Sequence, residues 1–313
     1  MQRKLVAVDW GTSSLRGALM NSEGVVLEKR AFPQGIMQVA HGQFQHVFEQ
    51  RFGDWMAADT LCLISGMAGS RQGWREAPYC PCPSGFAVIA QHLQWIEKDR
   101  IGIVPGLSTW HESTPDVMRG EEIQIFGALT SQHIHSAQFV LPGTHSKWAQ
   151  VANGNITAFK TFMTGEFYAL LSQHSILAKT CLPDAPLKKE VFIDGVMQSQ
   201  KPGGLLHHAF SARSLALFEK LNPAQSSSYI SGLLIGEEIK SAKNERHERH
   251  ERHEKLEDQL PPLFILGNGQ LTQRYSFAME ALGLPATALA DEVTWTGLWA
   301  LAQHLYPQDF TLS

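Results

Sequence analysis

The sequence predicts an α/β protein of two domains, in which mixed β-sheets are flanked by helices and the domains enclose a cleft. Apolar strands come first in antiparallel hairpins and then alternate with helices, a pattern typical of α/β sheets of mixed direction. The length of 313 residues corresponds to about two domains. A strand–Gly-Thr–strand unit also occurs twice, about one domain apart along the chain, which indicates two related folds.

The first of these units opens the chain. An apolar strand runs into Asp9, a turn containing Gly11, Thr12 and Ser13, and a second strand at 15–20. Gly11 has no Cβ, so the backbone there can turn sharply and approach a ligand closely. Asp9 suits a hydrated Mg²⁺, and the residues of the turn offer N–H and hydroxyl groups to phosphate. An ordinary hairpin with Asp9 as a turn cap is the alternative.

The next elements follow from apolar spacing. Residues 25–31 continue the hairpin as a third strand, and the run Leu61–Ile64 is typical of a strand buried on both faces. A short strand is expected at 101–105. Helical spacing predicts the following helices: 43–57, 117–131, 231–239, 271–282 and 292–306. In the helix at 231–239, Gly232 and Gly236 would allow close packing at an interdomain hinge.

The second strand–turn–strand unit lies between apolar strands at 137–141 and 146–151. Its candidate ligands for phosphate or substrate are Gly143, Thr144, His145 and Lys147. Lys147 could act in catalysis by meeting the γ-phosphate, could meet a substrate carboxylate, or could be a solvated strand lysine. His145 could bind substrate or be a turn residue only.

A third element follows the apolar strand at 263–266. There, Gly267, Asn268 and Gly269 precede a helix, so a nucleotide could lie against bare backbone. We expect these residues to face adenine and ribose, with a plain helix-entry turn as the alternative.

Composition excludes several classes. A net charge of −4 gives no reason to expect a nucleic acid or anionic membrane as partner, and no apolar run is long enough to cross a membrane. The four scattered cysteines indicate reduced thiols in a cytoplasmic protein. The Glu-Arg-His repeats at about 243–259 indicate a charged, low-complexity insertion, either a solvated helix extension or a loop. No GxxxxGK[ST] is present, which excludes a simple P-loop kinase, and the missing GxGxxG argues against a Rossmann site.

Together, DWGTSS, LPGTHSKW and LGNGQLTQRY resemble the three nucleotide motifs of the actin-like ATPase superfamily, whose two ribonuclease H-like domains close around ATP. More narrowly, the chain resembles the 2-dehydro-3-deoxygalactonokinase family. The strings that carry the resemblance span nearly its whole length: VAVDWGTSSLR, SGMAGSRQGW, VPGL, VMRGEE, LPGTHSKW, TFMTGE and SGLLIGEE. The resemblance implies domains at 1–116 and 117–313, with ATP and Mg²⁺ as cofactors. It also implies transfer of a phosphoryl group to the 6-hydroxyl of 2-dehydro-3-deoxy-D-galactonate in galactonate catabolism.

The general base is the hardest role to assign. Related kinases carry an Asp at the start of a helix before the second phosphate turn, where this chain has Glu121 and Glu122. A carboxylate at a helix N-terminus is held ionised and can accept a proton. Glu121 is our first candidate, Glu122 is the reserve or a substrate ligand, and Glu166 competes as base or as ligand of a substrate hydroxyl. The two glutamates could instead only stabilise the helix.

The substrate that the resemblance implies is a carboxylate, and a planar guanidinium matches a carboxylate through two hydrogen bonds. Arg71 and Arg119 are therefore the candidate carboxylate ligands. Rival hypotheses are a kinase of another sugar or keto-deoxy sugar acid, and a non-catalytic sugar-responsive regulator or a chaperone on the same fold. The expected partners are the sugar acid and ATP alone, and a homodimer is compatible with the sequence.

Overall fold

The computed structural model describes residues 3–182, 184–252, 261–267, 269–290 and 292–311. Its internal packing divides the chain into two compact units. The first unit contains residues 1–137, 149–159 and 290–313, and the second contains residues 138–148 and 160–289. The predicted domains at 1–116 and 117–313 describe two related folds and not packing units, so they stay a prediction. The cleft between the domains also stays a prediction.

A six-stranded sheet in the order β3-β2-β1-β4-β7-β6 forms the centre of the first unit. Strand β1 pairs antiparallel with β2 and parallel with β4, as expected for a hairpin that feeds a mixed sheet. The side chains of β4 are all buried, which confirms the interpretation of its apolar run. The strands are β1 (Leu5–Trp10), β2 (Leu15–Met20), β3 (Val26–Phe32), β4 (Leu61–Gly66), β6 (Gln94–Glu97) and β7 (Ile101–Ile103).

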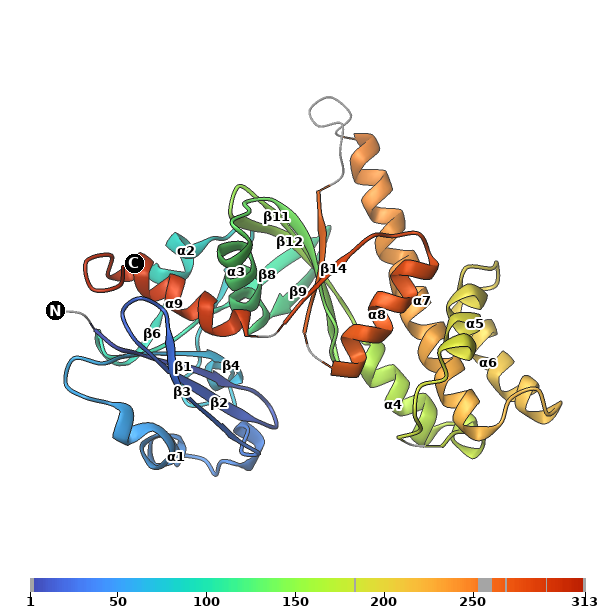
Figure 1. Ribbon diagram of the computed structural model, residues 1–313, viewed down its shortest axis with the longest axis horizontal. Coiled ribbons are helices and arrows are strands. Elements are labelled where there is room, and N and C mark those ends of the chain that lie inside the picture. The colour runs from blue at the N-terminus through green and yellow to red at the C-terminus, as the bar shows by residue number, and fades with distance from the viewer. Residues whose placement is uncertain (1–2, 183, 253–260, 268, 291, 312–313) are drawn as a thin grey trace. The chain divides into compact units, whose positions relative to one another are not determined.

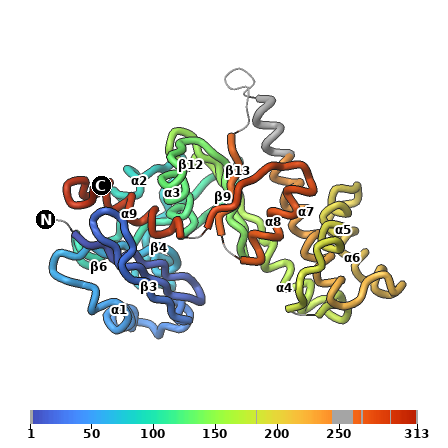
Figure 2. Tube along the Cα trace, in the orientation of Figure 1, coloured from blue at the N-terminus to red at the C-terminus, as the bar shows by residue number. Residues whose placement is uncertain are grey.

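Four α-helices of the described residues belong to this unit: α1 (Phe44–Phe52), α2 (Phe86–Gln91), α3 (Glu121–Gln132) and α9 (Val293–Leu305). The C-terminal helix α9, red in Figures 1 and 2, packs against α3 and also contacts β1. The end of the chain thus completes the core around the sheet that the start of the chain forms. Short 3₁₀ helices cover Ile36–Gln38, Gly53–Trp55 and Met67–Gly69.

A small three-stranded sheet of β5 (Tyr79–Pro81), β8 (Gly106–His111) and β9 (Thr114–Met118) was not predicted. It corrects one boundary, because the helix expected from residue 117 begins only at Glu121. Val117 pairs with Ser108 of β8 in the antiparallel ladder. Since that pairing partner is remote in sequence, local spacing could not separate the strand from the helix.

The second sheet has five strands in the order β12-β11-β10-β13-β14. Strand β13 pairs parallel with both β10 and β14. The strands are β10 (Ala137–Leu141), β11 (Ser146–Ala152), β12 (Asn155–Phe162), β13 (Leu263–Leu266) and β14 (Thr287–Leu289). Both strands of the second predicted strand–turn–strand unit are therefore confirmed, as is the strand before Gly267.

The long helix α7 (Pro223–Arg252) organises the helices of the second unit, and α5 and α6 pack along it (Figure 1). The other helices are α4 (Thr164–His174), α5 (Lys189–Ser199), α6 (Gly204–Leu217) and α8 (Gly269–Ala281), with a 3₁₀ helix at Ile176–Thr180. A Cβ on Gly232 would lie 1.9 Å from the carbonyl oxygen of Phe192 in α5. The close packing expected of Gly232 is thus confirmed, but its partner is α5 inside this unit, not an interdomain hinge.

The charged insertion begins as a continuation of α7, which remains helical to Arg252. This agrees with a helix extension for that part of the segment, whereas residues 253–260 lie outside the described residues. No helix within the described ranges combines the length and the apolar character that a membrane crossing needs.

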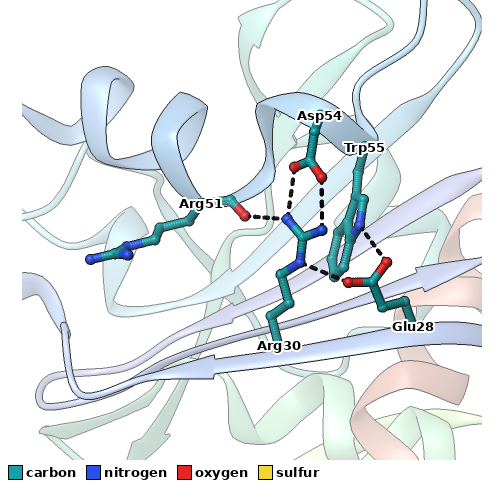
Figure 3. Close-up of polar contacts among 5 residues, drawn as sticks. All are labelled: Glu28, Arg30, Arg51, Asp54 and Trp55. Atoms are coloured by element: carbon teal, nitrogen blue, oxygen red, sulfur yellow. Dashed lines mark hydrogen bonds and ion pairs between the residues drawn. The ribbon is translucent and has the colours of Figure 1, made fainter.

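An exposed polar cluster joins β3 to the end of α1 (Figure 3). The Arg30 guanidinium pairs with both carboxylate oxygens of Asp54 at 2.7 Å and also donates to Glu28 at 2.9 Å. It lies 4.1 Å from the centre of the Trp55 ring, whose N–H donates to Glu28. The hydrogen bonds from Arg30 lower the pKa of the Asp54 carboxyl.

Candidate functional site

The first candidate turn is closed by its own backbone and supported from behind. The N–H of Gly11 donates to the carbonyl of Ser14 at 2.9 Å, and the N–H of Ile36 donates to the carbonyl of Gly11 at 3.0 Å. The side chains of Thr12 and Ser13 are exposed. The turn therefore presents hydroxyl groups to solvent, as a phosphate ligand must.

Asp9 and Arg16 face each other across the hairpin, where the register pairs them directly. Nη2 of Arg16 lies 2.6 Å from Oδ2 of Asp9, and the Asp9 side chain keeps about one fifth of its surface exposed. The ion pair orients the carboxylate next to the turn. It is compatible with either a metal contact or a structural carboxylate.

Two glycines bring the start of α3 to the same edge of the sheet as Asp9. Gly66, at the end of β4, has φ of +92°, and Gly120, just before α3, has φ of +106°. A Cβ on Gly66 would lie 3.3 Å from Oδ1 of Asp9, and a Cβ on Gly120 would lie 3.3 Å from Cα of Gly66. Because positive φ favours glycine, both positions suit this close approach. Asp9 and Glu121, distant in sequence, are thus brought into one region.

The two glutamates at the start of α3 have different environments. Glu121 is half-buried, and its Oε2 accepts the N–H of Arg119 at 2.9 Å. Glu122 is fully buried, and its Oε2 accepts the N–H of Gly120 at 2.7 Å. Burial, reinforced by the charge of Glu121, raises the pKa of Glu122 to about 8. At neutral pH Glu122 is therefore mostly protonated, which makes it a poor proton acceptor.

Arg119 is a buried cation with incomplete hydrogen bonding. Its Nη2 donates to the carbonyl of Ala77 at 2.8 Å, and the guanidinium lies 4.3 Å from the centre of the Tyr79 ring. Nε and Nη1 are buried and have no hydrogen-bond partner within the described part of the chain. Arg71, in contrast, is exposed and pairs with Glu76 at 3.0 Å. Of these two candidate arginines, Arg119 is the one with buried donors that have no partner among the described residues.

The second candidate turn rests on the start of α4. The N–H of Glu166 donates to the carbonyl of Thr144 at 3.0 Å. Nε2 of His145 lies 2.5 Å from Oε2 of Glu166, so these two predicted residues meet. A Cβ on Gly165 would lie 2.5 Å from the carbonyl oxygen of Gly143. The turn and the helix therefore touch through bare backbone.

The other predicted residues of the second unit are placed as follows. Lys147 is buried in β11, which does not fit the alternative of a solvated strand lysine. Gly267 and Gly269 follow β13, and β13 runs parallel to the strand that leads into the Gly143 turn. The carboxyl ends of these neighbouring strands lie at one edge of the sheet. Asn268 lies outside the described residues.

Sequence reasoning missed a buried polar network in this unit. Its centre is the carboxylate of Glu238 in α7, and its other members are Ser146, Trp148, Thr164 and Tyr275. A signal was present: Leu234, Glu238 and Ala242 recur every four residues and share the buried face of α7. An acidic residue on an apolar face predicts a buried carboxylate that needs donors.

Neither a metal cage nor a reactive cysteine is found among the described residues. Within the described ranges, no group of three or more His, Cys, Asp or Glu side chains is gathered as a metal cage. The four cysteines are free, as predicted. Burial raises the pKa of the Cys80 thiol to about 11, so it stays a thiol.

The fold and the candidate residues define a class. Mixed sheets flanked by helices, with Gly-Thr turns between strands, belong to the actin-like ATPase fold shared by sugar kinases. The model of one family, described as 2-keto-3-deoxy-galactonokinase, matches residues 9–301 of the chain. The chain belongs to this family.

Individual relatives agree with this assignment. A Rhizobium meliloti (strain 1021) protein, whose name gives 2-dehydro-3-deoxygalactonokinase as its expected activity, is 34% identical over 96% of this chain and 97% of its own. The 2-dehydro-3-deoxygalactonokinase of Escherichia coli (strain K12) is 32% identical over 94% of this chain and 96% of its own. A crystal structure of a candidate 2-dehydro-3-deoxygalactonokinase from Sinorhizobium meliloti has 33% identity and a TM-score of 0.85, covering 97% of this chain and 99% of its own.

Proposed function

We propose that the chain phosphorylates 2-dehydro-3-deoxy-D-galactonate with ATP at the 6-hydroxyl, giving the 6-phosphate and ADP, as a step of galactonate catabolism. The observation that carries this function is the family match over residues 9–301, which includes both Gly-Thr turns and the start of α3. The chain is a carbohydrate kinase, and the alternatives of a different sugar substrate or a regulator are not favoured.

In the proposed site, the first turn and Asp9 meet the phosphates and their metal. The backbone N–H groups and hydroxyls of residues 11–13 would contact phosphate oxygens. Mg²⁺ prefers oxygen ligands and keeps several waters, so one carboxylate such as Asp9 fits its needs. When bound, the ion would neutralise charge on the transferring phosphoryl group. Arg16 fixes the direction of the Asp9 carboxylate through their ion pair.

Glu121 is the proposed general base. It lies at the first position of α3, is half-buried, and accepts the N–H of Arg119, which orients its carboxylate. In the reaction its carboxylate would accept the proton of the 6-hydroxyl as that oxygen bonds to the γ-phosphorus and the bond from phosphorus to the bridging oxygen breaks, releasing ADP. Glu122 is the weaker base candidate, because its raised pKa leaves it mostly protonated at neutral pH. As a neutral group it could still donate a hydrogen bond to substrate.

Arg119 is the proposed ligand of the substrate carboxylate, because its buried Nε and Nη1 await acceptors. Arg71 is the alternative ligand. In the second unit, Gly143, Thr144 and Lys147 would meet the phosphates of ATP. The proposed substrate contacts there are His145 and Glu166, and the proposed contacts of the adenosine are Gly267, Asn268 and Gly269.

The remaining proposals concern the cellular setting. ATP and a catabolic sugar acid occur together in the cytoplasm, so we place the enzyme there. Its partners would be these small molecules, and a homodimer is the oligomeric state we would test first.

A coupled assay of ADP release tests the function. The panel contains Mg²⁺-ATP with 2-dehydro-3-deoxygalactonate, its gluconate epimer, galactonate and common hexoses. We expect turnover confined to the galactonate-derived keto acid, and a Glu121→Gln variant that lowers kcat by about 10²–10⁴-fold, the usual contribution of a general base. Absence of sugar-dependent ADP with every compound would overturn the kinase. Full activity of Glu121→Gln would exclude that residue as base.

A further inference from the structure

The carboxylate of Glu238 is buried, and none of the roles assigned above uses it. Only 3% of the residue is exposed. Nε1 of Trp148 donates to its Oε1 at 2.8 Å, and the hydroxyl of Tyr275 donates to its Oε2 at 2.6 Å. The hydroxyl of Thr164 also donates to Oε2. Three neutral donors thus compensate a charge that would otherwise be costly to bury.

The network extends by one step to the second candidate turn. The Tyr275 hydroxyl lies 2.8 Å from Oγ of Ser146, two residues after Thr144. Trp148 follows on the same strand, β11. Thr164 directly precedes Gly165, whose backbone touches the carbonyl of Gly143. The donors therefore belong to the strand that leaves the turn, the helix that supports it and the helix α8.

We propose that Glu238 is a positioning residue that holds the Gly143-Thr144 turn, the start of α4 and helix α8 in one arrangement for the phosphates of ATP. This inference rests on the proposed phosphate-binding role of that turn. Glu238 acts on the turn indirectly, through its donors Trp148, Thr164 and Tyr275, and the Tyr275 hydroxyl in turn contacts Ser146.

The chemistry of the network favours positioning over stability alone. A well-packed apolar side chain in place of a buried charge is often neutral or stabilising, so a buried carboxylate is a weak source of stability. The Glu238 carboxylate instead fixes positions, because each donor can reach it in a hydrogen bond only from one location. Burial raises the pKa of Glu238, and the hydrogen bonds at its carboxylate, with that of Thr164 first, reduce this shift without reversing it.

The chain offers a matched pair of variants. Tyr275→Phe removes one oxygen and breaks the links from Tyr275 to both Glu238 and Ser146. The control is Tyr229→Phe, because Tyr229 is also buried and its hydroxyl also lies 2.8 Å from a serine, Ser211 of α6. Tyr229 belongs to the packing of α6 on α7 and has no assigned part in the site.

The readout is binding of a non-hydrolysable ATP analogue and of adenosine, by calorimetry, with the melting temperature measured in parallel. A lost hydrogen bond is worth about 1 kcal/mol, so we expect Tyr275→Phe to weaken the analogue about fivefold. Adenosine should lose less affinity than the analogue, because it has no phosphates and its proposed contacts lie only at the start of α8. Both variants should lower the melting temperature by similar amounts. If Tyr275→Phe does not fold, Thr164→Val removes another donor to the same oxygen and should give the same result.

Two failures can be separated with Thr144→Val. If this variant binds the analogue as tightly as the parent, the phosphate role of the turn is wrong, and the inference fails with it. If Thr144→Val weakens the analogue but Tyr275→Phe behaves like Tyr229→Phe, the turn binds phosphate and the positioning role of Glu238 is wrong.

Discussion

Each unit buries a carboxylate beside a structural motif of its candidate site, but the two carboxylates are held differently. Glu122 in the first unit accepts the N–H of Gly120, while its Oε1 has no hydrogen-bond partner within the described residues. Glu238 in the second unit receives three side-chain donors from three other elements. The first carboxylate is held by its own helix start, and the second ties several elements together. Similar motifs can therefore depend on local or on tertiary support.

The largest expected effect comes from displacing each turn directly. A Cβ on Gly35 would lie 2.3 Å from the backbone of Thr12, and a Cβ on Gly165 would lie 2.5 Å from the carbonyl oxygen of Gly143. Gly35→Ala and Gly165→Ala should each lower kcat/KM about 10²-fold, as misplacement by about 1 Å can. Gly165→Ala should also lower the free energy of unfolding more than Gly35→Ala does. The reason is that the Gly143-Thr144 turn cannot shift without moving residues that are hydrogen-bonded to Glu238.

Enzyme kinetics and urea unfolding measure these two effects. Gly53→Ala is the control, since its Cβ would approach nothing closer than 3.8 Å. If Gly35→Ala and Gly165→Ala lower the free energy of unfolding equally, the two turns do not differ in how they are supported. Wild-type activity in Gly165→Ala would remove its turn from the site.

A smaller effect is the dependence of stability on pH, which we expect Glu122 to contribute. Burial raises the pKa of Glu122 from 4.5 in the unfolded chain to about 8 in the folded one. Between these two pH values the folded state holds a proton on Glu122 that the unfolded chain has released. The contribution of Glu122 to the free energy of unfolding is therefore complete below pH 4.5 and is lost as the pH rises toward 8. The slope contributed is at most about 1.4 kcal/mol per pH unit.

Glu122→Gln should remove this part of the pH dependence and make the protein relatively more stable at pH 8. Unfolding by urea at several values between pH 5 and pH 8 checks it. Parallel stability curves for the parent and the variant would show that Glu122 does not titrate in this window.

We expect the smallest change in stability at the exposed cluster around Arg30 in Figure 3. Its carboxylate, Asp54, is the exposed counterpart to the buried Glu122 and Glu238. Asp54 is 64% exposed, and such pairs contribute about 0–1 kcal/mol. Asp54→Asn should lower the free energy of unfolding by less than about 1 kcal/mol, and less at high salt. Since Arg30 lowers the pKa of Asp54, this contribution is present above pH 3.8 and is lost at more acidic pH.

Unfolding at low and high salt and at two pH values tests this prediction. A loss that is large and independent of salt would mean that the cluster works through packing of Arg30 on Trp55 instead of through charge.

Several features could be predicted because neighbouring residues cause them. The alternation of apolar strands with Gly-Thr turns located both candidate turns, and the strands around them have nearly the expected bounds. The position of Glu121 at a helix start was also predicted, although the helix begins four residues later than expected. That error arose because β9 pairs with β8, a contact that no local pattern records.

The sequence by itself determined the family, the mixed α/β fold and the residues that flank each turn, since glycines, strand periodicity and short motifs act over a few neighbouring positions. Only the tertiary structure decided how those residues are supported. Glu238 lies 74 positions from Thr164 and 90 from Trp148, and its carboxylate connects the two only when α7 packs against α4 and α8. The physical reason is burial: a carboxylate seeks donors from any element near it once water is gone, and those neighbours are set by packing, not by sequence order.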